Sequence, residues 1–397
     1  MLEKTLAGIR VLDLTQNVAG PYCTQTLGDL GAEIIKIERP GRGDDIREWR
    51  PPEVGGQSAT FLSLNRNKKS ICIDIDAPEG QKLIADLARD ADVFIHSMKP
   101  GSAEQRALGH DDLRGANPKL IYCAISAFGQ VGPLKNLPGY DPLMQAFTGI
   151  ISTLGRDGDD PSRVSVSLID MGTGMWAALG ILAGLMGRQQ SGEGVRVDAS
   201  LMDTGIAWMT VIVAGFLASG KLPRRLGSGV GMTAPYELFR TSDGHVFIAA
   251  GNNRMYARMC EGIGAPHLVD DERFLTNPLR VANRDALRAE IEKHTTSRTA
   301  AENIARLRPT GTPCSELNDV SQMLAHEQVK AAGMIAPLPI ATSANHKVVA
   351  LPLKANGARS SNMSPPPELG ADTDAVLKRL GRSDDEITRL RAAKTIG

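Results

Sequence analysis

Apolar and polar residues alternate near the start of the chain in the order expected of a strand, a helix and a second strand. Ile9–Leu14 and Glu33–Glu38 are β-prone runs of strand length. Between them, Pro21 stands where a helix begins, Tyr22–Leu30 carries a helical pattern, and Gly31 ends it. A strand, a helix and a strand in this order predict a βαβ unit and a parallel sheet.

The same alternation continues down the chain. Further strands are expected at Ser70–Ile75, Val93–Ile95 and Leu120–Ser126, with a helix at Gly80–Arg89. We therefore predict an α/β fold whose large domain is Rossmann-like, with a parallel sheet.

The stretch Val164–Gly187 has an unusual pattern. It opens with an alternating run up to Ile169 that is typical of a strand, and continues as a small-residue apolar segment expected to be helical. Its small residues leave room for close packing: Gly172, Gly174, Ala177, Ala178, Gly180, Ala183 and Gly184. Asp170 is the only ionisable group between Arg163 and Arg188. A carboxylate in such surroundings is expected to be a helix N-cap, a catalytic group, or both.

The second half of the chain predicts a smaller α+β domain. Tyr236–Phe239 and His245–Ala249 flank a Ser-Asp-Gly turn and predict a hairpin. Helices are expected at residues 254–263, 284–294 and 299–306, and near the end of the chain at 372–380 and 384–392. The predicted domains are 1–217 (large domain), 218–333 (small domain) and 334–397 (a segment returning to the large domain). The longest apolar run, Gly205–Ala218, is too short to span a bilayer and predicts a buried helix.

Composition narrows the functional classes. Lys plus Arg and Asp plus Glu both number 45, so no overall field favours nucleic acid or an anionic membrane. The five cysteines are scattered without a C-x-x-C pair, which is typical of reduced thiols in a cytoplasmic enzyme and not of a disulfide framework or a zinc site. The first residues contain acids and bases and no apolar core, so no signal peptide is predicted.

Polar and basic residues gather in the loops after the predicted strands, where α/β sheets bind ligands. Gln16 and Asn17 follow the first strand, Arg39–Gly43 the second, and His96–Gly101 a later one. Asn65–Lys69 lies just before a strand instead. Taken singly, each is explained as an ordinary solvated loop; together they suit a ligand with several phosphates. Neither a G-x-G-x-x-G after the first strand nor a P-loop motif is present.

Several ordered blocks of the sequence resemble the family III CoA-transferases, the CaiB/BaiF group. They are LAGIRVLDLTQNVAGPYCTQTLGDLGAEIIKIERPGRGD (6–44), NRNKKSICIDI (65–75), ADVFIHSMKPG (91–101), LIYCAISAFGQVGPLKNLPGYDPLMQA (120–146), SLIDMGTGMWAALGILAGL (167–185), RQQSGEGVRVDASLMD (188–203), YELFRTSDGHVFIAAGN (236–252) and GTPCSELNDVSQMLAHEQVKAAGM (311–334). The similarity runs over nearly the whole chain.

The resemblance implies roles for individual residues. Asp170 matches the aspartate that forms the covalent intermediates, and Gln16, Asn17, Val18 and Ala19 match the loop near the thioester. The positions expected to hold the adenosine and phosphates of CoA are Arg39, Lys68, Lys69, Ser97, Met98 and Lys99, with Arg106 as a further arginine. Backbone N–H groups near Gln16–Ala19 and the side chains of Gln16 and Asn17 are candidate donors to tetrahedral intermediates. The run Gly227–Gly231 falls where some members have a glycine-rich loop over the intermediates.

The resemblance also implies an assembly and a set of partners. The subunit is expected to be ring-shaped and to form an interlocked homodimer. The expected substrates are an acyl-CoA, with succinyl-CoA as a first choice, and a free carboxylic acid. Coenzyme A acts as a substrate, and neither a tightly bound cofactor nor a metal is expected, because each step exchanges one activated acyl group for another. The cation that would bind the acceptor acid stays open among Arg47, Arg66 and Arg224.

The main alternative is an α-methylacyl-CoA racemase of the same superfamily, which also has an aspartate at the position of Asp170. Its second base is a histidine in a Gly-His-Asp motif, and this chain has Gly139-Tyr140-Asp141. A phenol is a poor substitute for that base, which favours the transferase; Tyr140 is then a substrate contact or a packed aromatic. A hydrolase lacks its motifs here, since His326-Glu327 is not followed by a second histidine and no G-x-S-x-G occurs. An inactive CoA-binding protein would be signalled by loss of Asp170.

Overall fold

The computed structural model describes all of residues 1–397, and the chain divides into two compact units. Unit 1 is Met1–Thr148, Val164–Thr210 and Gln328–Gly397; unit 2 is Gly149–Arg163 and Val211–Glu327. The boundaries at 210 and 327 replace those predicted at 217 and 333. The segment Gly149–Arg163, predicted in the large domain, belongs to unit 2. There Arg156 and Leu226 form an isolated antiparallel β-bridge.

Unit 1 is built on one six-stranded sheet in which every neighbouring pair is parallel. Its order is β5 (Lys68–Cys72), β2 (Glu33–Glu38), β1 (Arg10–Leu14), β6 (Val93–His96), β7 (Ile121–Ser126) and β8 (Arg196–Ser200). This is the doubly wound order, with the direction of winding reversing between β1 and β6. The predicted α/β fold with a parallel sheet is confirmed.

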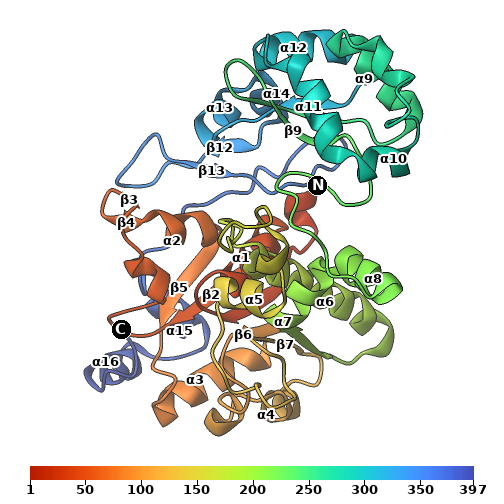
Figure 1. The fold of residues 1–397 in the computed structure, drawn as a ribbon. Helices are drawn as coiled ribbons and strands as arrows, with labels where there is room; N and C mark the ends of the chain where they lie inside the picture. The colour runs from red at the N-terminus through yellow and green to blue at the C-terminus, as the bar shows by residue number, and fades with distance from the viewer. The chain divides into compact units, whose positions relative to one another are not determined.

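Helices cover both faces of the sheet, which is why its strands are apolar on both sides (Figure 1). Leu12 and Phe94 face a core shared with Leu83 of α3 and Leu377 of α15. On this face lie α3 (Pro78–Arg89), α4 (His110–Ala116), α15 (Thr373–Arg379) and α16 (Asp384–Ala392). On the other face lie α1 (Ala19–Asp29) and α6 (Leu168–Ser191).

Helix α6 packs closely because its glycines have no side chains. A Cβ on Gly174 would lie 2.4 Å from the carbonyl oxygen of Ala19 in α1, and one on Gly180 would lie 2.6 Å from Val197 in β8. The predicted close approach is therefore confirmed at these glycines. The strand predicted up to Ile169 is wrong, because α6 already begins at Leu168. By length and composition α6 is apolar enough to cross a membrane, as α7 and α8 are if taken together, but half of the α6 window is buried inside the unit, as in a core helix.

The single buried helix predicted over Gly205–Ala218 is also wrong. The segment forms α7 (Leu201–Trp208) and α8 (Thr210–Ser219), separated at Met209. None of the residues of α8 is buried in the single chain, although its mean hydropathy is high. Its apolar side chains thus remain available to another surface.

The rest of unit 1 consists of short elements around the sheet. The C-terminal segment binds the edge strand β5, where the Asp372 carboxylate accepts from Ser70 N and Thr373 Oγ1 accepts from Cys72 N. The remaining elements are η1 (Leu2–Lys4), η2 (Asp45–Glu48), β3 (Glu53–Val54), β4 (Gln57–Ser58), α2 (Ala59–Leu64), η3 (Glu104–Arg106), α5 (Asp141–Phe147), α14 (Glu327–Ala332), β12 (Ile335–Pro337) and β13 (Lys347–Val349).

Unit 2 has an antiparallel sheet and its own apolar core around Phe239 and Tyr256. The predicted hairpin forms β9 (Tyr236–Arg240) and β10 (His245–Ala249), and β11 (Cys314–Glu316) pairs with β10. Its helical elements are η4 (Ile151–Thr153), α9 (Asn253–Ile263), η5 (Pro266–Val269), α10 (Asn277–Ala282), α11 (Arg284–Thr295), α12 (Ala300–Leu307), η6 (Arg308–Thr310) and α13 (Val320–Ala325).

Candidate active site

The sheet of unit 1 places two loops side by side where its winding reverses. Gln16 follows β1 and Ser97 follows β6, and Gln16 N donates to Ser97 Oγ at 3.0 Å. Asn17, which has a left-handed φ of 65°, donates its N–H to Asp44 Oδ1 at 3.1 Å. Asparagine tolerates this backbone region better than most residues, and the two hydrogen bonds hold the loop in place.

A cavity of about 110 Å³ opens beside this loop. It brings together seven of the predicted site residues from four separate parts of the chain. Its lining residues are Gln16, Asn17, Val18, Ala19, Gly20, Trp49, Ser97, Ile125, Ser126, Ala127, Gly139, Tyr140, Asp170 and Leu201. All of them belong to unit 1.

Asp170 is the third residue of α6, so it is not the helix N-cap that the sequence suggested. Ser167 occupies the cap position, and its side chain makes no capping bond. The carboxylate of Asp141 caps the helix instead, accepting from the N–H groups of Ile169 at 2.7 Å and Asp170 at 3.1 Å. The side chain of Asp170 is thereby released from capping and lines the cavity.

The surroundings of Asp170 disfavour its charge. Burial, and then the nearby Asp141 carboxylate, raise its pKa from 3.8 to about 7. A helix N-terminus favours the charged form of a carboxyl group, but with no cation against this carboxylate the effect of burial prevails. A carboxylate with a pKa near 7 is partly ionised at neutral pH and is a stronger nucleophile than an ordinary aspartate once ionised.

Only some of the expected oxyanion donors remain available in the structure. The N–H groups of Gln16 and Asn17 are already used by Ser97 and Asp44. At the first turn of α1, which follows Val18 and has no side-chain cap, the N–H groups of Ala19 and Gly20 remain as donors at the cavity. Gln16 Oε1 accepts a long hydrogen bond from Arg39 Nη2 at 3.4 Å, which leaves the Gln16 amide NH₂ as a further donor.

Lys68 is not placed where a phosphate can reach it. Its side chain is fully buried, and its ammonium donates to Asp13 Oδ2, Asn65 Oδ1 and Pro21 O. Burial lowers its pKa to about 8 although Asp13 opposes the shift. The ammonium supports the base of the active-site loop, since Asp13 also binds the N–H of Thr15.

The other predicted CoA residues do not all lie at one edge of the sheet: Arg39 and Lys99 follow strands at the carboxyl edge, whereas Lys69 lies at the amino end of β5. Arg39 is partly exposed and pairs with Asp45, and its Nε is buried without a partner. Lys69 pairs with Glu33, Lys99 is exposed, and Met98 packs on the core while its N–H donates to His96 Nδ1. Arg106 binds Asp76.

Two of the three arginines considered for the acceptor acid are already used in the core. Arg47 forms a bidentate pair with Glu38 and lies over the ring of Phe61. Arg66 pairs with the buried Asp29. Only Arg224 is well exposed, and it belongs to unit 2, where it pairs with Asp157.

The run Gly227–Gly231 is tied to the body of unit 2. Gly227 N donates to Gly155 O at 2.8 Å, and Ser228 Oγ accepts from Leu238 N at 2.9 Å. Arg284 Nη2 donates to Val230 O. These bonds give the run a defined conformation within the unit.

Sequence reasoning missed two contributions to the cavity. Trp49 forms part of its wall, and Asp141 organises the helix that carries Asp170. The sequence does indicate a helix start at Asp141, since an acid directly before a proline is typical of a helix N-terminus. It does not indicate that Asp141 caps α6, because Asp141 and Ile169 are 28 residues apart.

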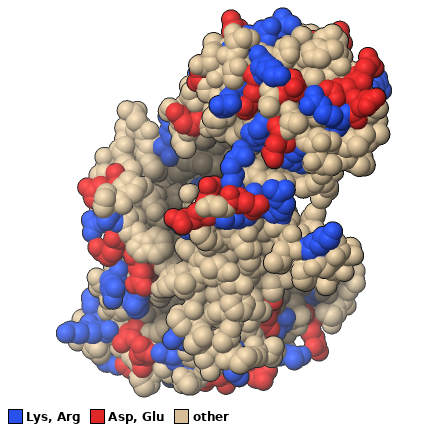
Figure 2. Space-filling view, viewed as in Figure 1, with Lys and Arg blue, Asp and Glu red and all other residues tan.

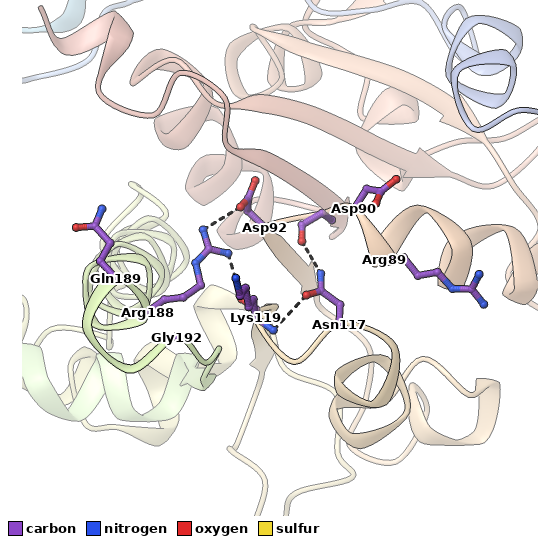
Figure 3. A pocket seen from close by; sticks show the side chains of 9 residues that line it. Arg89, Asp90, Asp92, Asn117, Lys119, Arg188, Gln189 and Gly192 are labelled. Atoms are coloured by element: carbon purple, nitrogen blue, oxygen red, sulfur yellow. Dashed lines mark hydrogen bonds and ion pairs between the residues drawn. The ribbon is translucent and has the colours of Figure 1, made fainter.

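A larger hollow, of about 540 Å³, lies at the opposite, amino edge of the sheet (Figure 3). It is lined by Arg89, Asp90, Ala91, Asp92, Asn117, Lys119, Arg188, Gln189 and Gly192. Arg188 pairs with Asp92 at 2.8 Å and donates to Lys119 O, and Asn117 Nδ2 donates to Ala91 O. None of the predicted site residues lines this hollow.

The profile of CoA-transferase family III matches residues 6–373. The chain belongs to this family. It is 37% identical to the mouse succinyl-CoA:glutarate CoA-transferase over 96% of this chain and 88% of that protein. It is 35% identical to the succinate–glutarate CoA-transferase of Agrobacterium fabrum over 94% of this chain and 95% of that protein. A solved CaiB/BaiF family protein from Brucella suis superposes with a TM-score of 0.84 at 35% identity, over 94% of this chain and 99% of that one.

Membership of CoA-transferase family III makes this protein an enzyme that moves CoA between acyl groups. The racemase alternative is not favoured, because the curated relatives are named as CoA-transferases. No group of three or more His, Cys, Asp or Glu side chains that could hold a metal ion is present.

Proposed function

We propose that this family III CoA-transferase carries CoA covalently on Asp170. The observation that supports this most is a carboxylate that lines a cavity without a cation partner, its pKa raised to about 7, beside the loops expected to hold CoA. Structural carboxylates are normally paired or exposed, so an uncompensated one in a cavity is typical of a reactive group.

The proposed reaction begins when an Asp170 oxygen attacks the thioester carbon of the acyl-CoA. The C–S bond breaks, a mixed anhydride forms and CoA leaves as its thiolate. The thiolate then attacks Cγ of Asp170, the C–O bond to the donor acyl group breaks, and the donor acid leaves as a carboxylate. Asp170 is now a neutral CoA thioester. The acceptor carboxylate reverses the two steps, takes the CoA and restores the Asp170 carboxylate.

Features of the cavity suit these steps. Gly174 lets α1 approach α6, so the free N–H groups at the start of α1 lie near Asp170. Such donors stabilise the oxyanion of a tetrahedral intermediate. The narrow cavity also limits water near the anhydride and the thioester.

We further propose succinyl-CoA as the donor and a short dicarboxylic acid as the acceptor. The names of the two curated relatives support this choice, since both pair a succinyl group with glutarate. The cavity volume of about 110 Å³ suits a short chain. Its lining contains neither lysine nor arginine, so a second carboxylate bound within it would be held by Gln16, Asn17, Ser97 or Tyr140.

The chain is proposed to work as a homodimer, in the interlocked form implied by the family resemblance. Support comes from an apolar face of unit 1 over α5, α6 and α7 that carries few charges (Figure 2). Its exposed side chains are Leu143, Phe147, Met175, Trp176, Leu179, Met186, Ile206 and Trp208. A face of this kind is normally covered in the functional assembly.

Gel filtration in increasing denaturant tests the interlocked dimer and should show no folded monomer. A stable folded monomer would contradict interlocking.

The decisive experiment mixes the protein with a panel of acyl-CoA donors, quenches the mixture and measures intact mass. We expect a CoA adduct with succinyl-CoA that maps to Asp170 and is released by hydroxylamine. The variant D170N should form no adduct. Absence of any adduct, together with deuterium uptake at the α-carbon of a branched acyl-CoA, would contradict the proposal and favour the racemase.

A further inference from the structure

Asp141 is held in one orientation at the first turn of α6. Asp141 is only 3% exposed, and its Oδ2 accepts from the N–H groups of Ile169 and Asp170. Oδ1 accepts from Gln145 Nε2 at 2.5 Å. Gln145 in turn binds Val164 through both its N–H and its carbonyl group. The carboxylate therefore has three donors and fixes the chain on both sides of the turn that leads to Asp170.

None of these donors carries a charge. Each is a backbone or side-chain amide, and no salt bridge to Asp141 is present. Burial, and then the Asp141 carboxylate, raise the pKa of the Asp170 carboxyl. A negative charge at this position opposes a second negative charge on Asp170.

The proposed reaction changes this repulsion. The free enzyme carries a carboxylate at Asp170, whereas the thioester form is neutral there, because the charge leaves with the donor acid. A fixed anion beside Asp170 therefore raises the free energy of the unloaded form relative to the loaded form.

We propose that Asp141 is a positioning residue that sets the backbone of Asp170 and, through its negative charge, favours loading of CoA onto Asp170. This inference rests on the proposed function and extends it to a second carboxylate. Asp141 accepts from the N–H of Asp170 and does not line the cavity, so it acts through Asp170.

The test compares the wild type with D141N. Both are equilibrated with the same ratio of succinyl-CoA to succinate, and the fraction of CoA-loaded enzyme is measured by intact mass from pH 5 to 9. We expect D141N to lower the loading equilibrium at pH 8 roughly tenfold, the size of effect expected when one nearby like charge is removed. The midpoint of the pH dependence should also move to lower pH.

Two variants separate the charge from fold stability. D141S is also neutral, and its hydroxyl can still accept an N–H bond from the helix; it replaces D141N if that variant does not fold. D29N removes another buried acid of unit 1, one that pairs with Arg66. It should lower thermal stability without moving the loading midpoint.

The outcomes are distinct. If a folded neutral variant loads CoA to the same extent and with the same midpoint as the wild type, the role of Asp141 is disproved while the covalent mechanism stands. If the wild type itself forms no adduct, the proposed function fails first.

Discussion

The amino and carboxyl edges of the parallel sheet each have a hollow, and the two hollows differ in the pairing of their charged side chains as well as in volume. At the amino edge, the lining of the hollow of about 540 Å³ includes Arg188, which pairs with Asp92, and Arg89, which pairs with Asp86. At the carboxyl edge, the cavity of about 110 Å³ contains Asp170 with no cation against it. The proposed function places the reaction in the smaller cavity, because the Asp170 carboxylate there has no cation beside it.

The physical origin of this difference is the direction of the helices. Helices between parallel strands start at the carboxyl edge, where free N–H groups favour anions and oxyanions. They end at the amino edge, where basic residues such as Arg89 at the end of α3 and Arg188 near the end of α6 complement the carbonyl groups. One edge is thus suited to chemistry and the other to stability.

The largest effect should come from exchanging the nucleophile. D170N keeps the shape of the side chain but cannot form the anhydride, so transfer should fall at least roughly a thousandfold. R188A, at the other edge, should keep activity within about twofold, because it is remote from the cavity. Steady-state transfer from succinyl-CoA to glutarate measures both. Substantial turnover by D170N would contradict the assignment of the active site to the carboxyl edge.

The same Asp-to-Asn change should have opposite effects on stability at the two edges. The pKa of Asp170 is raised to about 7, so its contribution is fully present below pH 3.8 and is lost as the pH rises through 7. D170N removes the buried charge and should stabilise the protein at pH 8 by about 2 kcal/mol, less at pH 5. D92N keeps only one side-chain oxygen, so it can accept from Arg188 or from Arg10 N but not from both, and it should destabilise the protein by about 1 kcal/mol.

Thermal unfolding of both variants at pH 5 and pH 8 measures this contrast. A D170N variant that is less stable than the wild type at pH 8 would show that the Asp170 charge is compensated in the folded protein, which contradicts the difference between the two edges.

A smaller contrast lies along α6 itself, which runs from one edge to the other. G174A places a methyl group 2.4 Å from Ala19 O and should lower the free energy of unfolding by about 1–3 kcal/mol while displacing α1 at the cavity. The methyl group of G187A meets no neighbour within 4 Å. This variant should raise the free energy of unfolding by up to about 1 kcal/mol, because alanine has a higher helix propensity than glycine. Denaturant unfolding compares the two variants; equal effects would mean that α1 and α6 are not in tight contact.

Local pattern by itself determined much of the fold. The strands before Gln16 and Ser97, the helix between the first two strands, and the hairpin of unit 2 each follow from residues close in sequence, because their periodicity and turn residues are local. Asp170 stands out as a helix cap or a catalytic group because it is alone in an apolar stretch, and its role as nucleophile was implied by the resemblance. The resemblance of ordered blocks was enough to indicate the family.

Only the tertiary structure decided what each charged side chain does. Lys68 and Arg66 looked like ligands in the sequence, but the sheet and α1 bring Asp13 and Asp29 to them. Asp170 looked like a cap, but Asp141, far away in sequence, supplies the cap and leaves Asp170 free. The partner of a charge is set by packing between distant segments, and neither periodicity nor composition carries that information.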